Sequence, residues 1–512
     1  MRKAIACLLG VATVACSIAG CGGAKKESDA PDYSASTAQF ERWAYTAVYD
    51  GWWQTVLPDG TEVRLENSTE TPVAITSKES LQEYKDCGMN VLFINYIYSV
   101  SGPNFIGSQT EKIMDWAHEL DMKCMLFEGT VRAFSQYEES VINPDKADGE
   151  KFFSTQKEFE DYLYNRVKDV IAHPAFLGFT LRDEPSYKML PAMGQTYKAL
   201  QSIAPNSHNM INLLPMYGGK SVVPHYCEGA LEMPLHEAYQ RYLQTYLDCT
   251  GADYVQYDSY PLLGDDNRQS LDEDYVWNMQ IVAEFAKKNN LRFDHVFQSC
   301  AWRSTAQNGQ TVAGARKPTE ADMRWQINIG MAMGIKGYAY WNYYPCVNTN
   351  GEHHDLTSSF LNRDGSQNAM YGWMKKLHGE MQVTEKALAN FDYVTSRVTT
   401  CDPVPGLTTH IQGVTQGEFS ALRYDLQSAG ILLISELYDD EKELTGYYIC
   451  NATDSLEKSS LDISLTFDGY DRAQYYFRGN VEELVLEHGE ITLRLPTGQG
   501  GFIIPYKTTK MK

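Results

Sequence analysis

From about residue 40 to residue 392, short apolar runs alternate with longer stretches in which apolar side chains recur every three or four positions. Short apolar runs bounded by polar residues are typical of buried parallel strands, and the longer spacing is typical of helices that bury one face. The pattern predicts eight strands, at residues 43–49, 90–96, 123–128, 176–182, 209–213, 254–258, 295–299 and 337–342.

Helical patterns lie between these strands. We expect helices at residues 77–86, 155–171, 272–288, 319–333 and 367–390. Eight strand-then-helix units in a segment of this length predict an α/β fold, a (β/α)8 TIM barrel. The alternative is an open doubly wound sheet, which usually carries a glycine-rich phosphate turn after its first strand. The corresponding turn here, Asp50-Gly-Trp-Trp-Gln, has no such pattern, so the barrel is favoured.

The pattern of apolar and polar residues changes after Asp392. Helical periodicity ends, and short alternating runs follow, separated by turns rich in Gly, Asp and Asn. Runs of this kind, for example at residues 461–467 and 491–495, predict an all-β sandwich over residues 393–512.

The N-terminus has the pattern of a secretory signal. A basic start, Met1-Arg2-Lys3, precedes a short apolar run, and Ile18-Ala19-Gly20-Cys21 looks like a bacterial lipobox. The run is too short to span a membrane. We therefore expect a signal peptide at residues 1–20, a lipid on Cys21, a tether at residues 21–38 and a barrel at residues 39–392. The protein would be lipid-anchored in a bacterial cell envelope, outside the cytoplasm. The alternative, a buried N-terminal helix, is disfavoured by the polar tract at residues 22–29.

Charge and cysteine content limit which ligands and cross-links we expect. A formal net charge of -22 argues against nucleic acid, because a phosphate-binding face needs clustered Lys and Arg. The cysteines beyond Cys21 show no Cys-x-x-Cys pair, so buried thiols are favoured over a disulfide framework. His353-His354-Asp355 reads as a polar loop rather than a metal site. We expect neither a cofactor nor a metal.

The most informative stretch is residues 176–185, where apolar and polar side chains alternate. One face would pack on the outer helices, and the other, ending in Arg182 and Glu184, would face the barrel axis. Glu184 would then stand at the C-terminal mouth, where barrel enzymes hold their reactive groups. The alternative is that Asp183-Glu184-Pro185 only begins a helix.

Asp183-Glu184-Pro185 resembles the Asn-Glu-Pro motif that barrel glycoside hydrolases often carry at the end of strand four, with Asp in place of Asn. The resemblance covers about residues 40–392. Residues 316–324 and 330–341 are similar to the last helix and eighth strand of uncharacterised hydrolase-like lipoproteins and, more distantly, of family 42 β-galactosidases. The resemblance implies a carbohydrate substrate, with Glu184 as the general acid that protonates the leaving oxygen.

The chain departs from that family at strand seven. The family's nucleophile is a Glu there, whereas this chain has Gln298, and an amide does not form the glycosyl-enzyme ester. Asp258, at the end of strand six, is our first candidate for the missing carboxylate, and Glu128 is the second. An inverting enzyme needs a base about 6.5–9.5 Å from the acid. Either carboxylate has the alternative role of shaping the mouth through hydrogen bonds.

Aromatic residues follow several strand ends. Sugar rings present C–H faces that stack on such side chains, although loop packing is the alternative. The aromatic residues are Trp52, Trp53, Tyr260, Trp302, Trp341 and Tyr343. Our expected substrate-binding set is Tyr260, Trp302, Trp341, Trp52, Asp50, Arg182, Asp183 and Gln298.

Three hypotheses follow. The first is a glycoside hydrolase acting on extracellular oligo- or polysaccharide. The second is a non-catalytic carbohydrate-binding surface lipoprotein that has lost the strand-seven nucleophile, as Gln298 suggests. The third is a purely structural surface lipoprotein.

Overall fold

The computed structural model describes residues 30–508 apart from several gaps. The gaps are residues 46–47, 50–53, 57–61, 65–76, 96–104, 129–130, 132–133, 136, 139, 145–152, 265–268, 306–310, 345–358, 363–364, 402–408 and 458. The predicted signal peptide, Cys21, Asp50, Trp52, Trp53 and the 353–355 loop therefore lie outside the described residues.

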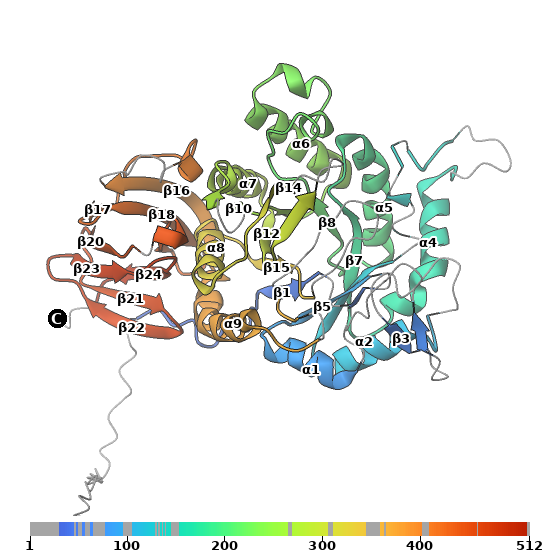
Figure 1. Ribbon diagram of the computed structural model, residues 1–512, viewed down its shortest axis with the longest axis horizontal. Coiled ribbons are helices and arrows are strands. Elements are labelled where there is room, and N and C mark those ends of the chain that lie inside the picture. The colour runs from blue at the N-terminus through green and yellow to red at the C-terminus, as the bar shows by residue number, and fades with distance from the viewer. Residues whose placement is uncertain are drawn as a thin grey trace, which may run out of the picture.

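The N-terminal two thirds of the chain form an eight-stranded parallel, nearly closed barrel (Figure 1). The first strand has two successive pieces: β1 (Glu41–Ala44) pairs with the last strand, and β2 (Val48–Tyr49) pairs with the second. The others are β5 (Val91–Asn95), β6 (Lys123–Phe127), β7 (Phe176–Asp183), β8 (Met210–Leu213), β9 (Tyr254–Asp258), β12 (Arg292–Gln298) and β15 (Gly337–Trp341). The barrel prediction is confirmed, with each strand near its predicted position.

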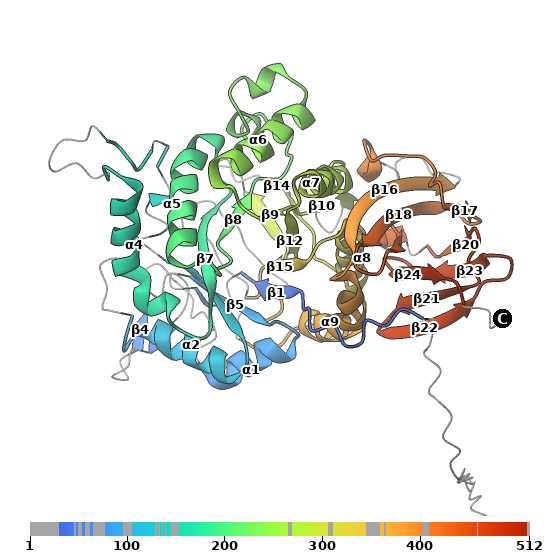
Figure 2. The same cartoon turned by 180° about the vertical axis from the view of Figure 1, so that it is seen from behind.

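Helices surround the barrel (Figures 1 and 2). They are α1 (Lys78–Asp86), α2 (Gln109–Glu119), α4 (Gln156–Ile171), α5 (Leu190–Ile203), α6 (Leu235–Thr250), α7 (Tyr275–Asn289), α8 (Glu320–Ala332) and α9 (Ala369–Leu388). The five predicted helices are present, and α2, α5 and α6 are additional. Helix α5 contains Gly194, which weakens its helical pattern. A Cβ at Gly194 would lie 2.3 Å from the carbonyl oxygen of Cys249, so the close approach of α5 to α6 requires the glycine.

Two smaller antiparallel sheets and several short turns extend the barrel loops. The strands β10 (Leu262–Gly264), β11 (Gln269–Leu271), β13 (Trp302–Thr305) and β14 (Thr311–Ala315) form a four-stranded sheet. It is inserted after β9 and β12, the sixth and seventh barrel strands, and so rises beside the mouth. A hairpin joins β3 (Gln54–Val56) to β4 (Glu62–Arg64). The 3-10 turns of the barrel are Tyr187–Met189, Val223–His225 and Ala230–Glu232, and those of the C-terminal region are Thr409–Ile411 and Ser455–Glu457.

The C-terminal region consists of two antiparallel sheets that share a buried apolar core. The strands of the six-stranded sheet, in spatial order, are β16 (Asp392–Cys401), β18 (Gly430–Asp439), β19 (Leu444–Asn451), β24 (Gly500–Tyr506), β21 (Arg472–Phe477) and β22 (Asn480–Val485). The three-stranded sheet contains β17 (Leu422–Leu426), β20 (Leu461–Phe467) and β23 (Glu490–Leu495). The all-β prediction is confirmed, whereas a domain boundary at residue 392 stays a prediction.

Polar contacts join the barrel to these sheets. Asn328 of α8 donates from Nδ2 to the Gly498 carbonyl at 3.0 Å, and the Tyr448 hydroxyl donates to its Oδ1 at 2.7 Å. Residues 30–40 also run past the C-terminal sheets (Figure 2), where the Tyr33 hydroxyl donates to Asp439 Oδ2 at 2.6 Å. Both the barrel and the segment that precedes it are therefore fixed to the C-terminal region.

Two sequence expectations concern membranes and thiols. Within the described residues, none of the helices has the length and apolar character that a membrane crossing needs. Cys87, Cys124 and Cys450 are buried thiols, as predicted. Burial raises the pKa of each, so these side chains act as small apolar groups rather than nucleophiles.

Candidate active site at the barrel mouth

Strand β7 brings its terminal acids to the mouth through a β-bulge. Thr180 pairs with Met210, but Arg182 pairs with the next residue, Ile211, so Leu181 is an extra residue in the ladder. Bulges re-aim side chains and are frequent beside active sites. The strict alternation predicted from the sequence is broken here. Arg182 is half-buried and forms no ion pair with a described acid.

Asn212 of β8 ties two strand ends together. Its Nδ2 donates to Asp183 Oδ1 and to Asp258 Oδ1, each at 2.8 Å. The two carboxylate oxygens are therefore no farther apart than twice that distance. Gln256 Nε2 donates to Asn212 Oδ1 at 3.4 Å, which fixes the amide orientation. Asn212 is buried, and it holds the acids of strands four and six side by side.

Glu184 leaves the strand in a strained conformation. Its φ of 46° lies in the left-handed region, which costs a branched or long side chain about 1–2 kcal/mol. Its amide N–H donates to the Asn212 carbonyl at 2.8 Å, which holds the turn in place. Strain of this kind is often found where a side chain is held for function. The Glu184 side chain remains accessible to water, within a concave wall of protein atoms.

The electrostatics of the mouth favour protonated carboxyl groups. Burial raises the pKa of Asp258 to about 7, with a further rise from Asp183, while hydrogen bonds from Tyr260 and Asn212 pull it back. Partial loss of water, together with the charges of Asp258 and Asp183, raises the pKa of Glu184 well above its usual range. Among the described residues, no Lys, Arg or His forms an ion pair with Glu184 or Asp258. A carboxylic acid that keeps its proton near neutral pH is suited to general acid catalysis.

Glu128, the second candidate carboxylate, contacts a neighbouring turn. It follows β6, is buried, and accepts the Val131 amide N–H at Oε2 with a 2.8 Å bond. It is not among the charges that raise the pKa of Glu184 or Asp258. This bond fits the alternative raised for Glu128, a carboxylate that shapes the mouth through hydrogen bonds, and its catalytic role stays a prediction.

Gln298 is also withdrawn from the mouth. The side chain is fully buried, and its Oε1 accepts the Leu262 amide N–H at 2.9 Å. Its Nε2 donates to the carbonyls of Cys300 at 3.1 Å and Arg316 at 3.5 Å. Both ends of the amide thus hold the loops that follow strands six and seven. A substrate contact by Gln298 would require one of these bonds to break.

The predicted aromatic residues divide into two groups. Tyr260 hydrogen-bonds Asp258, and Tyr260, Trp302 and Trp341 are all partly exposed. Tyr343 is buried and packs edge-on against Tyr84, with ring centroids 4.8 Å apart. Tyr343 therefore belongs to the core, whereas the other three remain available to a ligand.

Two residues at the mouth escaped the sequence analysis. Asn212 lies in an apolar strand, Met-Ile-Asn-Leu, where one polar residue among buried neighbours was a usable signal. Tyr45 follows β1, and its buried hydroxyl has no hydrogen-bond partner among the described residues. Its pKa is raised by burial and by the nearby Asp183, Asp258 and Glu184. Nothing in the local pattern distinguished Tyr45 from a core tyrosine.

A second charged cluster lies at the opposite end of the barrel. Among the described residues, only Glu41, His208 and Asp294 bring three potential metal-ligand atoms within 4.8 Å of one another. Arg292 already occupies this cluster, donating to Glu41 Oε2 at 3.0 Å and to Asp294 Oδ1 at 2.9 Å. The cluster is therefore an ion-pair network in which Arg292 already engages both carboxylates.

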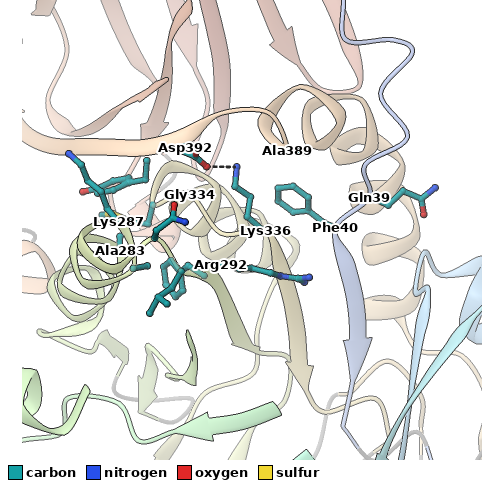
Figure 3. A pocket seen from close by; sticks show the side chains of 15 residues that line it. Gln39, Phe40, Ala283, Lys287, Arg292, Gly334, Lys336, Ala389 and Asp392 are labelled. Atoms are coloured by element: carbon teal, nitrogen blue, oxygen red, sulfur yellow. Dashed lines mark ion pairs between the residues drawn. The ribbon is translucent and has the colours of Figure 1, made fainter. Parts of the chain in front are cut away.

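A cavity of about 390 Å³ adjoins that network (Figure 3). Arg292, Lys336 and Asp392 line it. Lys336 Nζ donates to the Leu388 carbonyl at 2.6 Å and lies 4.0 Å from Asp392 Oδ1, the contact drawn in Figure 3. Its cationic groups are thus already engaged, so the cavity offers a ligand less than the mouth does.

Comparison with known proteins gives structural likenesses only. Neither a protein-family model nor a curated protein sequence matches the chain. An Anoxybacillus α-amylase structure shares 10% identity over 92% of this chain and 99% of its own, with a TM-score of 0.47. A glycoside hydrolase family 5 structure from Bacteroides vulgatus shares 11% identity over 91% and 89%, with a TM-score of 0.47. A GH27 β-L-arabinopyranosidase from Geobacillus stearothermophilus shares 9% identity over 94% and 98%, with a TM-score of 0.43. Because the identities are near 10% and the TM-scores are below 0.5, any inference about function has to rest on the residues of this chain.

Proposed function

We propose that the protein is a glycoside hydrolase that cleaves O-glycosidic bonds of oligo- or polysaccharide at the barrel mouth. The observation that carries the proposal is the carboxyl cluster of Asp183, Glu184 and Asp258, gathered by Asn212 at the C-terminal ends of strands four and six. Raised pKa values at Glu184 and Asp258 supply what glycoside cleavage needs, an acid that is still protonated near neutral pH.

Glu184 takes the role of proton donor. Glu184 is exposed whereas Asp258 is buried, and the bond-breaking step needs a proton on the leaving oxygen. Asp258, held by Asn212 and Tyr260, either positions a water molecule or stabilises the positive charge of the oxocarbenium-like transition state. The absence of a paired cation at these two described carboxyls favours that positive charge.

Glu184→Gln tests the proposal. It keeps the size of the side chain and removes the proton donor, so hydrolysis of an oligosaccharide, whose leaving alkoxide needs that proton, should fall about 10²–10⁴-fold. Glu441→Gln is the matched control, since it makes the same chemical change at an exposed turn of the C-terminal sheets. Thermal unfolding checks that both variants fold. Full activity in folded Glu184→Gln protein would exclude Glu184 as the acid.

A second candidate is a carbohydrate-binding surface protein without turnover. The specific observation in its favour is Gln298, which stands where the resembled family has its nucleophile and whose amide is bonded to backbone groups. Calorimetry against a panel of oligosaccharides, with product analysis by chromatography, separates the two functions. Tight binding with intact glycan after long incubation favours the second candidate, and released sugar favours the hydrolase.

The cell-envelope location is likewise a proposal. It rests on the basic start, the apolar run and Ile18-Ala19-Gly20-Cys21. Metabolic labelling with an alkyne fatty acid should mark the native chain and not Cys21→Ser. Labelling that survives Cys21→Ser would contradict the anchor, and it would leave the proposed hydrolase activity untouched.

A further inference from the structure

The segment that precedes the barrel, residues 30–40, is fixed to the C-terminal sheets at Tyr33. The buried Tyr33 hydroxyl donates to Asp439 Oδ2 at 2.6 Å, and Asp439 Oδ1 accepts the backbone N–H of Lys442 at 3.1 Å. The Lys442 ammonium lies 3.6 Å from the centroid of the Tyr33 ring and donates to the Asp32 carbonyl at 2.8 Å. We call the contacts of Tyr33 with Asp439 and Lys442 the Tyr33 clamp.

Strand register places the Tyr33 clamp level with the base, the end of the barrel opposite the mouth. Asp392, the first residue of β16, lines the cavity at the base and pairs with Tyr438, so Asp439 lies at the same end of the sheet. The other end of the sheet is level with the mouth. There the Ser455 hydroxyl donates to Asp322 at the start of α8, and barrel helices start on the mouth side.

The chain enters the barrel from the base as well. Phe40 lines the base cavity together with Arg292 and Lys336 (Figure 3), and β1 begins at Glu41, a member of the base ion-pair network. Residues 30–40 therefore run from the base end of the C-terminal sheets to the base of the barrel (Figure 2).

Covalent geometry limits how far the clamp can lie from Cys21. Cys21 and Ala30 are nine positions apart, so the chain between them spans at most about 30 Å. A flexible chain of that length averages about 17 Å. The 10 residues of β16 alone span roughly 33 Å between the base end and the mouth end of the sheet. A molecule with its mouth turned toward a bilayer would therefore hold Ala30 farther from the lipid than the tether reaches.

We propose that the base of the barrel and the turn between β18 and β19 face the lipid bilayer, and that the mouth opens away from it. This inference rests on the lipid anchor proposed for Cys21, and it assigns the Tyr33 clamp as the fixed point from which the tether leaves the folded chain. The mouth is then open to glycans in the surrounding medium and turned away from glycolipid headgroups of the anchoring bilayer.

Energy transfer from two single-cysteine variants to a bilayer tests the orientation. Asn206→Cys and Lys220→Cys place a donor dye on exposed residues that precede and follow the same strand, β8, at the base and at the mouth. Serine replaces the three partly exposed thiols, Cys227, Cys249 and Cys401. The lipidated full chain is reconstituted in vesicles of phosphatidylethanolamine and phosphatidylglycerol that contain a rhodamine-labelled acceptor lipid.

Transfer should be about twofold or more higher from Asn206→Cys than from Lys220→Cys, because the height of the barrel separates the two dyes along the bilayer normal. Equal transfer from the two dyes, or higher transfer from the mouth, would overturn the inference.

Two further variants test the cause of the orientation. Tyr33→Ala removes the clamp and should reduce the difference between the dyes, whereas Tyr164→Ala, which removes an exposed tyrosine of α4, should preserve it. An unchanged difference in folded Tyr33→Ala protein would exclude the clamp as the fixed point.

A Gly-Ser insertion of about 20 residues after Ser28 leaves the contacts of the described residues in place and extends the tether well beyond the height of the molecule. The difference between the dyes should then disappear. A difference that survives the insertion would overturn the inference, since something other than the tether would orient the chain. Thermal unfolding checks that each variant folds.

The inference and the proposals beneath it fail in different ways. If the native chain takes up no alkyne fatty acid, the anchor and the orientation fail together. If the lipidated chain shows equal transfer from the two dyes, the orientation alone fails. Neither result bears on hydrolysis, which Glu184→Gln tests separately.

Discussion

The two ends of the barrel carry acidic residues in opposite electrostatic settings. At the base, Glu41 and Asp294 share Arg292, and His208 Nδ1 lies 2.8 Å from Glu41 Oε2. The charges of His208 and Arg292 outweigh burial and lower the pKa of Glu41 to about 2. At the mouth, burial and like charges act on Asp258 without such a partner and raise its pKa to about 7.

The contrast separates stability from chemistry. The Glu41 carboxylate, paired with His208 and Arg292, prefers to be ionised, so the base contributes stability. Carboxyl groups that lie close together disfavour each other's ionised form, which raises their pKa and makes them suitable proton donors. Barrel enzymes generally keep their chemistry at the mouth and stabilising interactions at the base, and the two clusters of this chain follow that division.

The largest effect is expected for Asp258→Asn. Hydrolysis should fall about 100-fold or more, because the partner of Glu184 is lost. The urea midpoint at pH 8 should stay or rise, since a buried carboxylate is removed and Asn still accepts the bond from Asn212. A large loss of stability at pH 8 would contradict the view that burial and neighbouring charge make the ionised Asp258 carboxylate unfavourable.

The base should respond in the reverse way to Arg292→Met. Glu41 and Asp294 would lose their shared partner, and the free energy of unfolding should fall by about 2–3 kcal/mol at pH 7. Activity per folded molecule should be unchanged. Urea unfolding measures the loss of stability, and kinetics measure the activity per folded molecule. An unchanged urea midpoint in Arg292→Met would show that the network is not a source of stability.

The pH dependence of stability should differ between the ends. Asp258 has its pKa raised from 3.8 to about 7, so the folded state binds the proton more tightly and gains stability as pH falls from 7 to 4. Glu41 has a lowered pKa, so its contribution is lost as pH falls from about 4.5 toward 2.

Unfolding curves recorded across this pH range measure the contributions of both Asp258 and Glu41 to stability. The stability difference between wild type and Asp258→Asn should move by about 3 kcal/mol in favour of wild type between pH 7 and pH 4. Glu41→Gln should instead flatten the loss below pH 4.5. A constant difference for Asp258→Asn would mean that its pKa is not raised.

The smallest effect is expected for Tyr45→Phe. Its buried hydroxyl has no partner among the described residues, so removing the oxygen should leave stability unchanged or raise it by up to about 1 kcal/mol. Tyr84→Phe is the control, because the Tyr84 hydroxyl bonds the Val91 carbonyl and the Ala44 amide and its loss should destabilise. Destabilisation of similar size in both variants would point to a hidden partner for Tyr45.

Much of the fold was predictable because it follows from periodicity. The barrel strands are buried on both faces, so each leaves an apolar run, and helices such as α4 carry a clear three-to-four spacing from Phe159 to Val170. Helix α5 was not predicted, since its Gly194 serves the contact with α6 and not local propensity. At the start of α1, Ser80 completes with Ser77 the capping box that is usually closed by Glu, a pattern that the usual Glu signal would miss.

The site was less predictable because tertiary pairing decides it. Glu184 and Asp258 were found from their positions at strand ends. The bulge at Leu181, which alters the expected alternation and joins Asp183 to Asn212, depends on the register between β7 and β8. Glu128 has the same sequence signal as Asp258, and the different hydrogen bonds of the two carboxylates, to Val131 and to Asn212, appear only in the folded structure.

The joint between the barrel and the C-terminal sheets has a practical consequence for shortening the chain. Asp322 accepts Arg316 Nη1 at 2.7 Å and also the hydroxyl of Ser455, while the Arg316 carbonyl accepts Gln298. The C-terminal region thus braces the loop that leads from strand seven to the wall of the mouth. A fragment ending after α9 would lose that brace, so we expect deletion of the C-terminal sheets to loosen this loop and to change the glycan preference of the proposed hydrolase.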